Sequence, residues 1–99
     1  AQPKNVFFGH VVTSIVGMFF LYFVPIPLYM VLPIAVGTGV ALMILLNVTH
    51  PPAGGNPLIV IVGSVSVEYL LSPVVLGSAI MVIFGLVINR LILKKKYPI

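Results

Sequence analysis

Long apolar blocks alternate with short stretches of proline, glycine and polar residues along this chain. A helix needs about 20 residues to cross the ~30 Å hydrocarbon core of a bilayer. Three blocks reach that length and predict membrane-spanning helices over residues 6–24, 28–46 and 73–93. Pro33 lies near the start of the second block, so that helix either kinks there or begins there.

A further apolar block, residues 50–67, opens with an irregular stretch. Its first residues are His50, a pair of prolines and, after Ala53, a pair of glycines. Neither pair suits the interior of a regular helix. We therefore predict that residues 50–56 are extended and that a helix begins at Asn56-Pro57, because asparagine caps free amides and proline has no N–H to satisfy.

This broken segment can either cross the bilayer or turn back within it. As a helix, residues 57–67 rise only about 16 Å, which suits a re-entrant half-helix. If residues 50–56 are extended, they add up to about 23 Å, which completes a crossing that is half extended and half helical. Irregular backbone at membrane depth is tolerated where protein or a water-filled cavity satisfies its polar groups, so the break also indicates a binding site.

The charged residues favour the full crossing, and therefore four crossings in all. Lys4 precedes the first span, and four more basic residues follow the last one within residues 90–96. Under the positive-inside rule both termini are cytosolic, which requires an even number of crossings. Glu68, the one acidic residue, is expected in a solvated loop on the opposite side. Three tyrosines then form one aromatic belt: Tyr22, Tyr29 and Tyr69.

Composition fixes the class of protein. Of the 99 residues, 61% are hydrophobic and 6% are charged, whereas a soluble domain carries about 25% charged residues. We predict an all-α integral membrane protein, with residues 1–99 forming a single multi-pass domain of the plasma (inner) membrane. The net charge of +4 does not indicate nucleic-acid binding, because residues 94–96, all lysine, adjoin the last apolar block.

The residue types that catalysis needs are scarce. The chain has no cysteine, which excludes disulfides, thiol redox chemistry and thiolate metal sites. It also has no aspartate, no His and Glu at metal-ligand spacing and no serine in a nucleophile motif. We predict no enzymatic activity, no metal site and no cofactor.

Several stretches resemble the HPP family of small integral membrane proteins. The first is THPPAGG at residues 49–55, and the others are AQPKN at residues 1–5, Gly9-His10, and residues 72–77 through Asn89-Arg90. The resemblance implies four transmembrane helices and, from some plastid and cyanobacterial relatives, an association with nitrite transport. The family usually carries more hydrophobic sequence upstream, and this chain opens with alanine rather than methionine. We therefore expect it to lack an N-terminal portion.

The break itself is the first candidate site. A helix that begins at Pro57 inside the membrane would attract an anion through its free amides and its partial positive charge. Gly54 and Gly55 would let a ligand approach the backbone. His50 could donate a hydrogen bond or carry a proton, because its ordinary pKa lies close to physiological pH. In the alternative, the stretch is only a rigid loop and His50 caps a carbonyl at the end of the second helix.

The first span holds a second candidate, His10. An ionisable residue at that depth should face the bundle interior or a cavity. Alternatively, it lies at the interface and hydrogen-bonds to Ser14. Gly9, Thr13 and Gly17 share one helix face, so another helix could pack closely there.

These observations predict a transporter of a small inorganic anion, with nitrite favoured by the resemblance. The alternative is a non-transporting membrane scaffold or subunit. Because so few spans enclose little volume, we expect a homo-oligomer or a partner membrane subunit in the lipid bilayer. The candidate ligand-binding residues are His10, His50, Pro51, Pro52, Gly54, Gly55 and Asn56.

Overall fold

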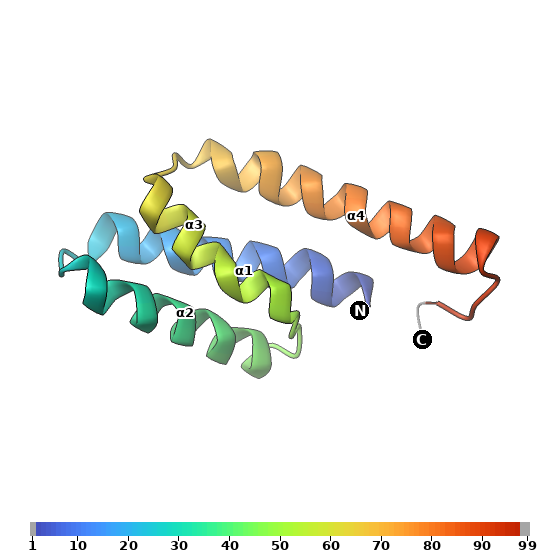
Figure 1. Cartoon of the computed structure of the whole chain (residues 1–99), viewed down its shortest axis with the longest axis horizontal. Helices are drawn as coiled ribbons and strands as arrows, with labels where there is room; N and C mark the ends of the chain where they lie inside the picture. The colour runs from blue at the N-terminus through green and yellow to red at the C-terminus, as the bar shows by residue number, and fades with distance from the viewer. Residues whose placement is uncertain (1, 98–99) are drawn as a thin grey trace.

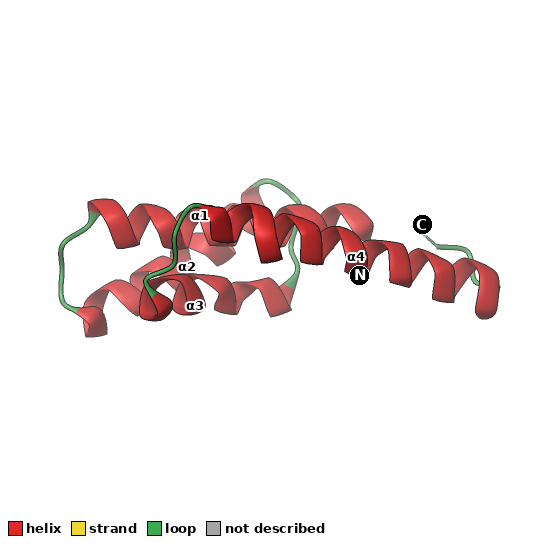
Figure 2. Cartoon of the chain, turned by 90° about the horizontal axis from the view of Figure 1, so that it is seen from above, coloured by secondary structure: helices red, strands yellow, loops and turns green. Residues whose placement is uncertain are grey.

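The computed structural model describes residues 2–97, and every regular element within them is helical (Figure 1). The elements are α1 (Pro3–Phe23), α2 (Leu28–Leu45), η1 (Pro51–Gly55), α3 (Asn56–Gly63), η2 (Leu70–Val75), α4 (Leu76–Leu86) and η3 (Val87–Ile92). The predicted all-α class is confirmed. The helices lie roughly along one direction, with the connecting segments at the ends of the bundle (Figure 2).

Three helices are long and apolar enough to cross a membrane: Pro3–Phe23, Leu28–Leu45 and Leu70–Ile92. They match the three predicted spans within a few residues. The second helix begins at Leu28 and continues through Pro33, so it does not begin at that proline. In the last span Ser72 has extended backbone (φ −143°, ψ 119°), so a continuous helical stretch begins at Pro73 as predicted, and it becomes the regular helix α4 at Leu76.

The extended conformation predicted for residues 50–56 is wrong. Pro51–Gly55 is a 3₁₀ helix that passes directly into α3. Proline suits the first turn of a helix because it has no N–H to leave unpaired. The amide of Ala53 then donates to the His50 carbonyl at 2.9 Å. The helix also stops earlier than predicted, at Gly63, followed by Ser64 in the left-handed conformation (φ 47°).

The third segment nevertheless runs the length of α1. At one end the Asn5 side chain donates to the Thr49 carbonyl at 2.8 Å. At the other end the Tyr22 hydroxyl donates to the Val65 carbonyl at 2.5 Å. Asn5 and Tyr22 lie about 25 Å apart along a helix. Helical backbone, rather than extended backbone, thus carries the chain from one end of the bundle to the other.

Helix α1 is the centre of the bundle, since α2, α3 and α4 all contact it. Figure 1 shows α3 running parallel to α1, with α2 and α4 antiparallel to both. The face of α1 that holds Gly17 packs closely against α3, as predicted. A Cβ on Gly17 would lie 2.9 Å from the Cα of Pro57. Many large apolar side chains remain exposed on the outside, including Phe23, Tyr29, Leu45 and Leu91. That surface suits contact with lipid tails.

Candidate functional site

Polar side chains of α1 and α3 meet inside the apolar bundle. Asn56, which is 7% exposed, points its Nδ2 at His10 Nδ1 (2.8 Å) and at Thr13 Oγ1 (3.1 Å). The side chain therefore joins two helices instead of capping its own helix, and the predicted capping role is wrong. The physical reason is the 3₁₀ turn before it, because Asn56 already has helical backbone (φ −59°, ψ −41°) whereas a cap residue has non-helical backbone.

This contact sets the proton position on His10. An amide NH₂ group can only donate, so His10 Nδ1 is the acceptor in this arrangement. The proton of the neutral ring then sits on Nε2, which leaves that nitrogen as a donor. The predicted alternative, a bond between His10 and Ser14, is wrong, since the buried Ser14 hydroxyl has no hydrogen-bond partner.

The second histidine packs against the first. The rings of His10 and His50 have centroids 5.1 Å apart and planes inclined by 62°. Gly9 permits this approach, because a Cβ there would lie 3.0 Å from the His50 Cβ and 3.0 Å from the Val48 carbonyl oxygen. The fold thus brings together two imidazoles that are 40 positions apart in the sequence. We call these two residues the histidine pair.

The carbonyls at the end of α2 are bound by backbone rather than by His50. The amide of Asn47 donates to Ile44 and that of Val48 donates to Met43. Asn47 adopts the left-handed conformation (φ 58°) that such a helix end uses. The predicted alternative, in which His50 caps this helix, therefore has no support in the hydrogen bonds of the described residues.

The amides expected to hold an anion are also largely satisfied within the chain. Pro51 and Pro52 have no N–H, and the next amide, that of Ala53, donates to His50. Gly54 and Gly55 lie inside the 3₁₀ helix. The start of this segment consequently has few free backbone donors. The donors that remain near it are side chains of the histidine pair and its neighbours.

A cavity of about 250 Å³ adjoins the cluster between α1, α3 and α4. Its lining residues are His10, Asn56, Tyr69, Pro73, Val74, Gly77, Ser78 and Met81. None of them is a carboxylate. The Ser78 hydroxyl donates to the Val74 carbonyl at 2.6 Å, so its oxygen is still able to accept. His10 therefore both contacts the His50 ring and lines this cavity.

Sequence reasoning missed Tyr69 and Ser78 as members of the site. Their approach to His10 depends on how α4 packs on α1, which no local pattern reveals. Of the seven predicted residues, the structure brings His10, His50 and Asn56 together. Pro51, Pro52, Gly54 and Gly55 form the adjoining 3₁₀ helix but do not line the cavity.

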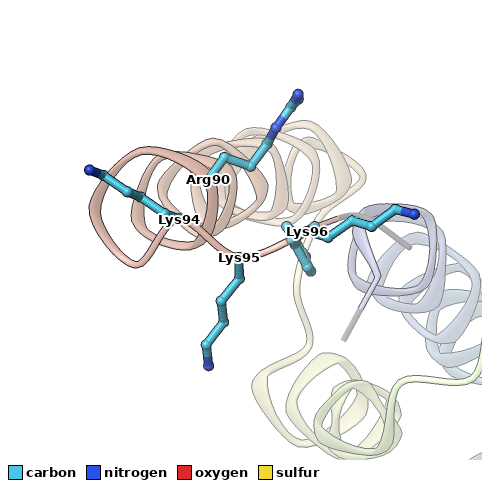
Figure 3. A pocket seen from close by; sticks show the side chains of 5 residues that line it. Arg90, Lys94, Lys95 and Lys96 are labelled. Atoms are coloured by element: carbon cyan, nitrogen blue, oxygen red, sulfur yellow. The ribbon is translucent and has the colours of Figure 1, made fainter.

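Basic residues also gather after the last long apolar block. Arg90, Lys94, Lys95 and Lys96 border an open pocket of about 520 Å³. Figure 3 shows these side chains pointing in different directions instead of converging on one point. Basic side chains that diverge in this way suit a membrane surface, where each charged group reaches solvent or lipid headgroups separately.

A family model described as the HPP transmembrane region matches residues 1–98. The chain belongs to the HPP family. The motif that gives the family its name is His50-Pro51-Pro52 here, and the structure shows what it builds: a histidine that packs on His10, followed by two prolines that start a helix.

Two relatives from Dictyostelium discoideum are both described as transmembrane proteins. One is 30% identical over 109 residues and the other is 29% identical over 106 residues. The alignments cover 100% of this chain but 37% and 34% of the relatives. This HPP chain therefore spans about a third of the length of these relatives. No solved structure matches it.

Proposed function

We propose that this HPP chain provides part of a membrane transport pathway for a small inorganic anion, with the histidine pair and the adjoining cavity as its binding site. The observation that carries the proposal is the contact of two imidazoles, 5.1 Å apart, beside a cavity without a carboxylate. Nitrite is the favoured anion, because some relatives that the sequence resembles are associated with nitrite transport.

The depth of the site supports transport. His10 is seven residues into α1, which is about 10 Å from the start of that helix. Ionisable residues inside membrane segments are costly and mark substrate or ion pathways. His10 also forms no ion pair with an acid, because Glu68, the one acidic residue, is exposed and lies outside the cavity lining.

The chemistry of the lining favours an anion over a cation. A cation site needs carboxylates or several converging carbonyls. The cavity instead offers a ring N–H from His10 and the Tyr69 hydroxyl, while the Asn56 amide holds His10 and Thr13 in place. Protonation of either histidine would add a positive charge next to the ligand.

The orientation follows from the basic residues. Figure 1 shows the N-terminus and the C-terminal end of the last helix towards the same end of the bundle, and the basic residues of the sequence are Lys4 and residues 90–96. We place that end, and both termini, in the cytosol of a multi-pass plasma-membrane protein. The third segment then completes the set of four crossings, beside α1.

Flux measurements in liposomes test the proposal. Purified chain is reconstituted, and nitrite, nitrate and chloride uptake are measured for wild type, His10→Ala and His50→Ala. Each variant should reduce anion uptake by at least tenfold. Tyr29→Phe, which removes a hydroxyl from an exposed ring far from the cluster, should transport normally. Cation flux with no response to any of the three anions would contradict the proposal.

A second candidate is a non-transporting subunit of a larger assembly. Within residues 2–97, α4 packs on α1 but on neither α2 nor α3, so most of its surface is open to a partner. A homo-oligomer or a second membrane subunit would cover it. Absence of anion flux together with a stable oligomer in mild detergent would favour this alternative.

A further inference from the structure

A second, apolar groove lies at the cytosolic end of the bundle as oriented above. It has a volume of about 380 Å³ and separates the first turns of α1 from the middle of α4. The lining residues are Pro3, Lys4, Phe7, Phe8, Ala79, Val82 and Ile83. Lys4 is the one charged residue among them, and it is exposed in the first turn of α1.

The one charged residue that lines this groove is basic, and four more basic residues stand within residues 90–96. Arg90 and the three lysines that follow η3 border a separate pocket, further along the last helix. The tail after η3 folds back towards α4, since the Tyr97 hydroxyl lies 3.8 Å from the position a Cβ on Gly85 would take. Lys96 extends from this tail in a direction different from Arg90 and Lys94 (Figure 3). The result is an apolar groove with one cation, Lys4, in its lining.

We propose that this groove binds an anionic phospholipid, with one acyl chain along the apolar walls and the phosphate on Lys4. Apolar walls alone would accept any lipid tail, so the cation is what selects the headgroup. Basic pockets between membrane helices on the cytosolic side recognise anionic headgroups in this way. The site is separate from the histidine pair and does not depend on transport.

Native mass spectrometry of the chain in a non-ionic detergent tests the site. Phosphatidylglycerol and phosphatidylcholine are titrated in turn, and the dissociation constant of the first bound lipid is measured. Phosphatidylglycerol should bind at least tenfold more tightly. Lys4→Gln should weaken it about tenfold, whereas Lys95→Gln, which removes an equal charge outside the groove, should weaken it less than Lys4→Gln does. Excess inorganic phosphate should not displace the lipid, because it lacks the tail.

The apolar walls are tested separately from the charge. Phe8 is half exposed and borders the groove, so Phe8→Ala removes wall area without affecting a buried core position. It should weaken phosphatidylglycerol and phosphatidylcholine by a similar factor of several fold. If Lys4→Gln and Lys95→Gln act equally and Phe8→Ala has no effect, the attraction is a diffuse surface charge and the proposed site is wrong.

Discussion

Gly17→Ala should destabilise the bundle although alanine is the better helix former. Relative to glycine, alanine stabilises a helix interior by about 0.5–1 kcal/mol. At this position the new Cβ would lie 2.9 Å from the Pro57 Cα and 3.0 Å from the Val60 Cβ. Backbone cannot rotate away as a side chain can, so α3 must move. Overpacking of this kind costs about 1–3 kcal/mol, which leaves a net loss of roughly 0.5–2 kcal/mol.

Gly37→Ala is the matched control, because nothing lies within 4 Å of the Cβ it would add. It should keep the greater helix propensity of alanine and stabilise the bundle by about 0.5–1 kcal/mol. Both variants are unfolded reversibly in mixed micelles by titration with sodium dodecyl sulfate, with helicity followed by circular dichroism. Equal stability of Gly17→Ala and Gly37→Ala would refute the close packing of α1 on α3.

Three further predictions concern the site and the topology. Asn56→Leu should destabilise the folded bundle by about 1–2 kcal/mol and lower anion uptake, since it leaves His10 without its partner. The control Asn89→Leu loses only a bond to Gly85 within its own helix. It should destabilise the bundle less than half as much and leave uptake unchanged. Glu68→Cys should react with an impermeant thiol reagent on intact cells, whereas labelling only after lysis would contradict four crossings. If protonated histidine assists binding, anion uptake should fall as pH rises through the pKa of the histidine pair, because the positive charge is lost. His50→Ala should flatten this pH dependence. An unchanged pH profile in that variant would exclude His50 as the source of the dependence.

The long spans could be predicted because they depend on little more than apolar length. The 3₁₀ helix at Pro51–Gly55 could not, since paired prolines and paired glycines are compatible with either an extended stretch or a tight turn. The choice depends on contacts far away in sequence, such as the one between Asn5 and Thr49.

The site was predictable only in part, because it too depends on contacts between residues that are distant in sequence. His10, His50 and Asn56 stood out as polar residues in apolar sequence. That Asn56 reaches across to α1 instead of capping α3 follows from the packing of Gly17 against Pro57, which no local pattern contains.

The most direct test of the central claim is whether the histidine pair acts as one anion site. Nitrite uptake into liposomes is measured for His10→Ala, His50→Ala and the double variant, with equal amounts of folded protein. If the two rings act on one ligand, either single change should disable the site, and the double variant should be no worse than the singles. Independent effects that multiply, or normal uptake in either single variant, would show that the two histidines do not form one site.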